Sequence, residues 1–301
     1  MAHPALPIVS APAEGETRYV LHRRFDRLGR LYGDGAVERL MSARVVVFGL
    51  GGVGGFAAEA LARSAVGRLM LVDFDDVCIT NTNRQLQALA TTIGKSKAHL
   101  LAERLRAVNP QGKVEASVEF YDAEHSEALL TSPWPGPTPS FDFVVDCIDN
   151  LTAKAHLLAT CRRLGIPVVS SMGAGGKTDP TRVRLADLAR TDVCRLAQQL
   201  RKMLRQKHAF PREGKRMGVM AVYSDEPRRW PRELTYDGGQ GFRCVCPKRD
   251  PRHNCNQRNL IDGTAAFVTG AFGLACAAHV VNTLVDEIAQ GSAPAEPRRR
   301  P

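Results

Sequence analysis

Short apolar runs alternate with longer amphipathic stretches through the first half of the chain. The apolar, β-branched runs predict strands at 44–49, 68–74, 114–120, 141–148 and 166–171. The stretches with apolar positions at helical spacing predict helices at 53–65, 96–108, 124–130 and 151–164. Strands that alternate with helices are typical of a parallel sheet, because each parallel connection needs a crossover. The sequence therefore predicts an α/β fold with a Rossmann-like, doubly wound, mainly parallel sheet.

The pattern changes after residue 171. Residues 181–188 alternate as an edge or antiparallel strand does, and residues 195–208 repeat apolar positions at helical spacing. The parallel sheet is therefore expected to be extended by antiparallel strands. The apolar stretch Thr264–Val285 is nearly long enough to span a membrane, but its glycines and the polar His279 and Asn282 favour a buried helix. Attachment of this stretch to a membrane surface remains an open alternative.

Composition adds a domain organisation to this pattern. The chain has 301 residues and is 44% hydrophobic, so it can bury a substantial core. Residues 1–17 and 292–301 are poor in large apolar side chains and are expected to be disordered tails. Between them we expect one adenylating domain at 18–291, with a Rossmann-like half at 18–171 and a basic, substrate-binding half at 172–291.

Charge and cysteine content narrow the partners and the compartment. The formal net charge is +10, and residues 201–258 hold fifteen Lys and Arg against six Asp and Glu. This excess favours a polyanion such as nucleic acid, while a solvated basic face is the alternative. With 6% aromatic residues, a base-stacking sheet of the RRM type is not expected. The eight cysteines are mostly scattered and no signal-peptide pattern opens the chain, so we expect a reducing cytoplasm.

The stretch RVVVFGLGGVGGFAAEALA (44–62) joins a strand to a helix through a glycine-rich turn. Gly49, Gly51 and Gly54 form G-x-G-x-x-G, which lets backbone amides approach a phosphate at the start of a helix. Asp73 ends the next strand and is placed to bind a ribose hydroxyl. NAD and ATP both offer a phosphate and a ribose, so this motif alone does not choose between them.

The residues that follow Asp73 favour ATP. Arg84 lies in the polar loop DFDDVCITNTNRQ, where a guanidinium suits a polyphosphate. Lys97 opens a helix, where the macrodipole disfavours a cation unless an anion lies close by. Asp146 and Asp149 end a strand at the carboxyl edge of the sheet, where a carboxylate near a triphosphate commonly holds magnesium.

Each of these features also has a purely structural explanation. Arg84 could pair with Asp75 or Asp76, Lys97 could be a solvated surface lysine, and Asp149 could cap the helix that starts at residue 151. Their occurrence together, in this order and at one sheet edge, is what favours an ATP site.

The series GLGGVG, DFDDVCITNTNRQ, GKSK, NP and DCIDN resembles the adenylating enzymes related to ubiquitin-activating enzyme, such as ThiF, MoeB and HesA. Within that superfamily, RFDRLGRLYG, DVCITNTNRQ and CRRLGIPVVSSMGAGGKTDPTRVRLADLA are similar to the tRNA threonylcarbamoyladenosine dehydratases. The likeness covers residues 25–188 and 263–281 and weakens between 190 and 259.

The resemblance implies roles for individual residues. Gly51, Gly52 and Val53 would contact the phosphates and Asp73 the ribose. The catalytic residues would be Arg84 and Lys97 on the β- and γ-phosphates, Asp149 on magnesium, and Arg27, which would reach into the neighbouring subunit of a homodimer. The full expected set for ATP is Gly49, Gly51, Gly52, Val53, Gly54, Asp73, Asp75, Asn81, Asn83, Arg84, Gln85, Lys97, Asp149 and Asn150.

The resemblance also implies a reaction, in which ATP adenylates the carboxylate of threonylcarbamoyladenosine 37 in tRNA and the adenylate then cyclises to a hydantoin. The chief alternative is adenylation of a ubiquitin-like or sulfur-carrier protein. An NAD-dependent oxidoreductase would leave Arg84, Lys97 and Asp149 without a shared purpose, and a non-enzymatic RNA-binding protein would consume no ATP.

The cysteines bear on the first of these alternatives. Sulfur-carrier activators commonly carry paired C-x-x-C zinc ligands, and this chain has none. The weak zinc candidates are Cys244, Cys246, His253 and Cys255, whose C-x-C spacing departs from the usual C-x₂₋₄-C. Loop thiols without a metal are the stronger interpretation, and a link to a cysteine desulfurase system is implied only by the resemblance.

Overall fold

The computed structural model describes residues 23–136, 140–234 and 262–291. The expected tails at 1–17 and 292–301 and the zinc candidates Cys244, Cys246, His253 and Cys255 lie outside the described residues. The division of the chain at residue 171 remains a prediction, and a single sheet continues across that point.

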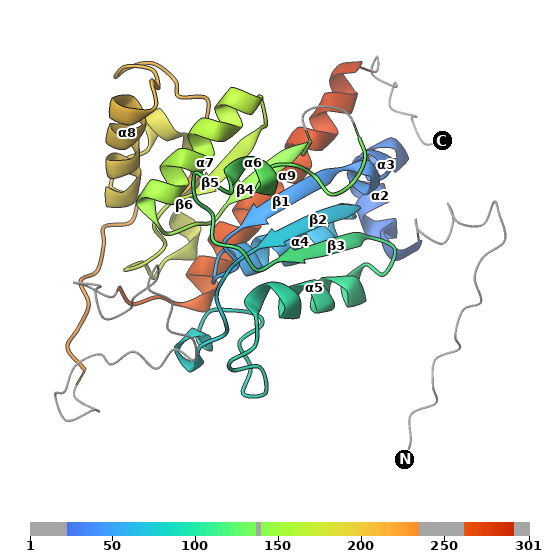
Figure 1. The fold of residues 1–301 in the computed structure, drawn as a ribbon, viewed down its shortest axis with the longest axis horizontal. Helices are drawn as coiled ribbons and strands as arrows, with labels where there is room; N and C mark the ends of the chain where they lie inside the picture. Colours follow the sequence, from blue (N-terminus) through green and yellow to red (C-terminus); the bar gives the residue numbers. More distant parts are fainter. Residues whose placement is uncertain (1–22, 137–139, 235–261, 292–301) are drawn as a thin grey trace, which may run out of the picture.

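Seven strands form one sheet within the described residues, in the order β3-β2-β1-β4-β5-β7-β6 (Figure 1). They are β1 (Arg44–Phe48), β2 (Arg68–Val72), β3 (Lys113–Ser117), β4 (Phe143–Asp146), β5 (Val168–Ser171), β6 (Val183–Asp187) and β7 (Met220–Ser224). Only β6, at one edge, runs antiparallel to its neighbour. The predicted α/β class and the mainly parallel sheet with an antiparallel extension are confirmed.

Helices cover both faces of this sheet. One face carries α2 (Asp26–Tyr32), α3 (Asp34–Ser42), α4 (Gly54–Arg63), α5 (Lys97–Val108) and α9 (Ala266–Gly291). The other face carries α6 (Ser126–Leu129), α7 (Leu151–Leu164) and α8 (Arg195–Lys207). Short 3₁₀ turns lie at Ile79–Asn81, Pro180–Arg182 and Leu188–Arg190. The result is a three-layer arrangement with two apolar cores.

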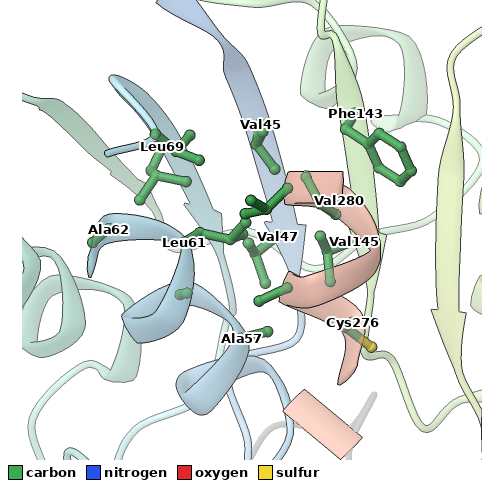
Figure 2. Packing of buried hydrophobic residues seen from close by; sticks show 14 of the residues in the cluster. Val45, Val47, Ala57, Leu61, Ala62, Leu69, Phe143, Val145, Cys276 and Val280 are labelled. Atoms are coloured by element: carbon green, nitrogen blue, oxygen red, sulfur yellow. The ribbon is translucent and has the colours of Figure 1, made fainter. Parts of the chain in front are cut away.

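The apolar run of β1 explains why its strand is central. Val45 and Val47 face the core shared with α4 and α9, while Val46 and Phe48 face the core shared with α7. Figure 2 shows the first of these cores, with side chains from β1, β4, α4 and α9 meeting one another. A strand buried on both faces must be apolar at every position, not at alternate positions.

Helix α9 corresponds to the apolar stretch Thr264–Val285. The sequence favoured a buried helix for this stretch and kept contact with a membrane as an alternative. Val268, Phe272, Cys276, Val280 and Leu284, at a spacing of four residues, are buried against the sheet and α4. Among the described helices, α9 alone is long and apolar enough to cross a membrane, with a mean hydropathy of 1.6 over the relevant window. Packing therefore explains the apolar residues on one face of α9, while Phe267 and Leu274 on the same helix are exposed.

The close approach of α9 to α4 depends on Gly273. A Cβ at this position would lie 2.4 Å from the carbonyl oxygen of Val53 and 2.8 Å from Cβ of Phe56. We expect Gly273→Ala to lower the free energy of unfolding by about 1–3 kcal/mol, because the helices must move apart. Urea unfolding measures this change.

The matched control is Gly35→Ala in α3, where a Cβ would meet no atom within 4 Å. This change should leave stability unaltered or raise it by up to about 1 kcal/mol, because alanine favours a helix over glycine. Equal effects of the two substitutions would contradict the packing explanation.

Candidate active site at the carboxyl edge of the sheet

The site is built where β1, β2 and β4 end. Phe48 is in register with Val72 on one side and with Asp146 on the other, so the residues that follow all three strands lie at one edge. From β1 the chain proceeds to β2 and β3 on one side, and later to β4 and β5 on the other. Ligands of open α/β sheets bind at such a reversal of strand order. The structure therefore brings the glycine loop, Asp73 and the region of Asp149 together.

Two glycines of the loop are required by its backbone. Gly49 has φ of 82°, and a Cβ there would lie 2.8 Å from the carbonyl oxygen of Cys147. A Cβ on Gly54 would overlap the carbonyl oxygen of Gly49 at 1.8 Å. Within the described structure, no side chain caps the start of α4 and no acidic residue lies in its first turn. The start of the helix thus carries an uncompensated partial positive charge, which suits an anion.

Asp73 holds the glycine loop in place. Its Oδ2 accepts a hydrogen bond from the amide of Leu50 at 2.6 Å, and its Oδ1 accepts one from the amide of Asp75 at 2.8 Å. Burial raises the pKa of Asp73, and the nearby charge of Lys97 opposes that rise. Each carboxylate oxygen can accept a second hydrogen bond, so the predicted ribose contact is compatible with this bracing role.

Lys97 is buried and is not a solvated surface lysine. Its Nζ lies 2.7 Å from Oδ2 of Asp75, and its amide donates to the Asp75 carbonyl at 3.1 Å. Burial lowers the pKa of Lys97, but Asp73, Asp75 and Asp149 outweigh burial, so that the pKa is raised. The anion that compensates for a cation at the start of a helix is therefore Asp75 of the same chain. The Lys97 ammonium remains charged at neutral pH.

Arg84 lies over the glycine loop. Its Nη1 donates to the carbonyl of Thr80 at 2.9 Å and to Oδ1 of Asn83 at 3.0 Å. A Cβ on Gly52 would come within 3.1 Å of Cγ of Arg84. The stem of the side chain thus lies against the glycine loop, and its own loop holds the guanidinium.

The first residues of α9 and the chain before it close the other side of the loop. Asn83 Nδ2 donates to the carbonyl of Thr264 at 2.9 Å. The Thr269 hydroxyl lies 3.1 Å from the position that a Gly52 Cβ would occupy. Two segments that lie 181 residues apart in sequence thereby meet beside the glycine loop. No local sequence pattern predicts this contact.

Two buried glutamine side chains beside the glycine loop each have an amide oxygen without a hydrogen-bond partner in the described residues. Gln87 donates from Nε2 to the carbonyl of Leu50 at 2.6 Å, yet its Oε1 accepts nothing. Gln85 is buried and its Oε1 is also unsatisfied. Buried polar atoms are nearly always paired, so these acceptors are suited to a polar ligand. The sequence analysis named Gln85 and missed Gln87.

Asn81, which the sequence analysis also named, has a structural contact. Its Oδ1 accepts a hydrogen bond from the amide of Cys78 at 3.0 Å and thereby shapes the polar loop.

Asp149 and Asn150 divide two tasks between them. The Oδ1 of Asn150 accepts from the amides of Thr152 and Ala153, both at 3.0 Å, so Asn150 caps α7. The capping explanation considered for Asp149 is therefore wrong. The Asp149 carboxylate is exposed and helps to raise the pKa of Lys97, which puts it on the ligand side of the edge. A nucleotide contact by Asn150 remains a prediction.

A buried ion pair underlies the site. Lys154 Nζ lies 2.7 Å from Oδ2 of Asp146, and the same oxygen accepts from the Ser170 hydroxyl at 2.6 Å. Lys154 also donates to the carbonyl of Ser171 at 3.0 Å, and both charged side chains are completely buried. This network ties α7 to β4 and β5. The sequence analysis named Asp146 as a residue of the ligand edge, but its carboxylate is completely buried and pairs with Lys154.

Arg27 is not brought to the site within one chain. It is exposed on α2, which lies with α3 near the start of β1, whereas the glycine loop follows the end of β1 (Figure 1). A second copy of the chain would be needed for Arg27 to approach this edge.

Cys147, a thiol at the edge of the site, is poorly suited to act as a nucleophile. Cys147 follows β4, and the adjacent Cys276 thiol together with burial raises its pKa well above the ordinary value. A thiol that stays protonated is a poor nucleophile. Within residues 23–136, 140–234 and 262–291, no group of three or more His, Cys, Asp or Glu could hold a metal on its own.

Comparison with known proteins agrees with this geometry. A model of the ThiF family matches residues 25–298. The tRNA threonylcarbamoyladenosine dehydratase of Haemophilus influenzae is 35% identical over 271 residues, covering 87% of this chain and 94% of that protein. The dehydratase of Bacillus subtilis is 39% identical, with 89% and 97% covered. The solved structure of the E. coli tRNA N6-threonylcarbamoyladenosine dehydratase in complex with ATP matches with a TM-score of 0.75 and 34% identity, covering 90% of this chain and 97% of that one.

Proposed function

The chain belongs to the ThiF family, and on that premise we propose that it catalyses the ATP-dependent dehydration of threonylcarbamoyladenosine at position 37 of tRNA to the cyclic hydantoin form. One observation carries the proposal. The glycine loop, Lys97 and Arg84 converge at one sheet edge, in a chain that matches dehydratases over nearly their whole length.

The reaction has two steps. The carboxylate oxygen of the threonyl group attacks the α-phosphorus of ATP, and pyrophosphate leaves. The carbamoyl nitrogen of the same substrate then attacks the activated carbonyl carbon, loses its proton and displaces AMP. The net change is loss of one water from the nucleoside. Because nucleophile and electrophile belong to one molecule, the second step needs mainly correct positioning.

The residues of this chain would bind and stabilise charge. The amides of Gly51, Gly52 and Val53 would hold phosphate oxygens, and Asp73 would accept from a ribose hydroxyl. Arg84 and Lys97 would neutralise the charge that develops as pyrophosphate leaves, and this kind of electrostatic stabilisation is commonly the largest catalytic contribution. The remaining predicted contacts, including Gly49, Gly54, Asp75, Asn81, Asn83, Gln85, Asp149 and Asn150, would shape the same pocket.

Asp149 fits a magnesium ion that is shared with the phosphates. It is an exposed carboxylate at the ligand side of the edge, close enough to Lys97 to affect its pKa. Protein sites for Mg²⁺ with nucleotides typically use one or two carboxylates together with phosphate oxygens. When bound there, the ion would neutralise phosphate charge. A single protein carboxylate is consistent with such a site.

A homodimer would complete the site by bringing Arg27 of the second copy to it. Mixing Arg27→Ala protein with Arg84→Ala protein, under conditions that exchange subunits, should restore up to about a quarter of the wild-type activity. Mixed dimers then contain one intact composite site. Each variant alone should be nearly inactive, and AMP formation measures the recovery. No recovery on mixing would contradict a shared site.

The cytoplasm is the proposed location, because the site acts on tRNA and the described cysteines are unpaired thiols. A cysteine desulfurase system is proposed as a further partner, on the family resemblance alone. Co-purification of a desulfurase with the full chain tests this second proposal.

The function is tested by AMP formation with defined RNA. Purified protein, ATP and magnesium should release AMP and pyrophosphate with tRNA that carries threonylcarbamoyladenosine, and not with the same tRNA lacking the modification. Release with a sulfur-carrier or ubiquitin-like protein instead would support the alternative adenylating function. Binding of tRNA without any AMP would support a non-enzymatic RNA-binding protein.

A further inference from the structure

An exposed tryptophan lies beside the candidate active site. Trp230 has 66% of its surface exposed. The guanidinium carbon of Arg228 lies 4.8 Å from the centre of its ring, which is the geometry of a cation–π contact. Neither residue is used by the proposed reaction. A large aromatic ring open to solvent and backed by a cation is the arrangement of a stacking surface.

The backbone that carries Trp230 is anchored. Buried Glu226 accepts hydrogen bonds from the amides of Thr178 and Asp179, at 2.9 and 3.0 Å. The amide of Arg229 donates to the carbonyl of Gly176 at 2.8 Å. Gly176 has φ of 69°, and a Cβ there would come within 2.8 Å of Arg228 Cγ. The ring is therefore presented by a fixed segment against the loop that follows β5.

The same segment is joined to the glycine loop. Arg228 Nε donates to Oδ1 of Asp262 at 2.9 Å. Two residues later, the carbonyl of Thr264 accepts from Asn83, next to Arg84 in the polar loop. The amide of Gly176 also donates to the carbonyl of Gly263, between these two residues, at 2.8 Å. Residues 262–264 thus contact both Arg228, which packs on Trp230, and Asn83 in the polar loop.

A basic helix starts at the same edge. Cys194 Sγ and Leu196 Cβ, at the start of α8, each come within 3.7 Å of the position of a Gly173 Cβ. Helix α8 buries one apolar face and has no Asp or Glu. Arg195, Lys202 and Lys207 are exposed on it, while Arg201 and Arg205 are half-buried and donate to the carbonyls of Thr191 and Pro211. Such a helix can contact phosphates without reading sequence.

We propose that Trp230, supported by Arg228, stacks an unpaired base of the tRNA anticodon loop, while the basic face of α8 contacts the phosphates of the adjoining stem. This inference rests on the proposed function, because position 37 lies in that loop. Single-stranded RNA loops are recognised by stacking their splayed bases on aromatic rings. Residues 262–264 would then hold the modified nucleotide next to ATP.

The test compares Trp230→Ala with Trp230→Phe and with Leu164→Ala, which removes a partly exposed apolar side chain at the far end of α7. Trp230→Ala should raise the Kd for the modified anticodon stem-loop and the KM for modified tRNA by roughly 5- to 150-fold, the value of one stacked base. Trp230→Phe should keep most of the affinity, and Leu164→Ala all of it. The Kd for ATP should be unchanged in all three.

Fluorescence gives a second readout. The other tryptophan, Trp134, is buried, so quenching of the exposed indole by the stem-loop should be strong in the wild type and lost in Trp230→Ala. If the wild type dehydrates the nucleoside and Trp230→Ala has unchanged Kd and KM, the stacking inference is wrong and the proposed function stands. If the wild type does not dehydrate the nucleoside, the proposed function is wrong, and the inference fails with it.

Discussion

Replacing Lys154 by Met should lower the free energy of unfolding by about 3–5 kcal/mol, the cost of leaving one member of a buried ion pair alone. Lys154 and Asp146 are both completely buried, and their charged atoms lie 2.7 Å apart. Without the ammonium, the Asp146 carboxylate retains the Ser170 hydroxyl and the Ile148 amide as donors but loses its counter-charge. Urea unfolding followed by circular dichroism measures the loss.

The double variant Asp146→Asn with Lys154→Met is the matched control. The amide side chain introduced by Asp146→Asn is neutral, and its oxygen could still accept from the Ile148 amide, so the double variant should be more stable than Lys154→Met alone. This result is expected because the penalty arises from an unpaired charge, and not from lost side-chain volume. A double variant less stable than both single variants would contradict this explanation of the network.

The second large effect is on activity. Arg84→Ala should lower the rate of tRNA-dependent AMP formation by about 10²- to 10³-fold, the usual effect of removing one group that stabilises transition-state charge. The Cγ of Arg84 lies close to Gly52, and the guanidinium is held by Thr80 and Asn83 in the same polar loop, so its position is largely set before phosphate binds. Single-turnover assays with saturating tRNA measure the change.

The control for Arg84 is Arg63→Ala. Arg63 lies near the end of α4, far along the helix from the glycine loop, and its exposed side chain pairs with the buried Glu59, which Arg104 also contacts. Its removal should leave AMP formation unchanged, because Arg104 still pairs with Glu59 and Arg63 lies at the opposite end of α4 from the glycine loop. Activity of Arg84→Ala within about threefold of the wild type would remove Arg84 from the proposed catalytic set.

The elements with complete local signals were the ones that sequence alone could place. Helix α7 was predicted at 151–164 and lies at Leu151–Leu164, because Asn150 caps its start and Gly165 ends it in the left-handed conformation. Strand β7 was missed, since five residues in a strongly basic region carry little periodicity, and its burial depends on β5 and β6 on either side. The helices α2 and α3 were also not predicted.

Local motifs likewise indicated where the candidate site lies. The position of the glycine loop, Asp73, Arg84 and Lys97 at one sheet edge could be predicted because motif order indicates which strand ends meet there, and their contacts with a nucleotide stay predictions. The partners of Lys97 and the role of Asn150 in place of Asp149 could not, since both depend on side-chain geometry.

Contacts between distant parts of the chain were least accessible to sequence. Arg228 and Asp262 lie 34 residues apart and Lys154 and Ser170 lie 16 apart, so only tertiary packing creates these pairs.

The most direct test of the account is the mass of the modified nucleoside after reaction. The protein is incubated with ATP, magnesium and tRNA that carries threonylcarbamoyladenosine, the tRNA is digested under mild conditions, and the nucleosides are analysed by mass spectrometry. The modified adenosine should lose the mass of one water, with one AMP formed for each nucleoside converted. An unchanged nucleoside, from protein that binds both ATP and the tRNA, would contradict it.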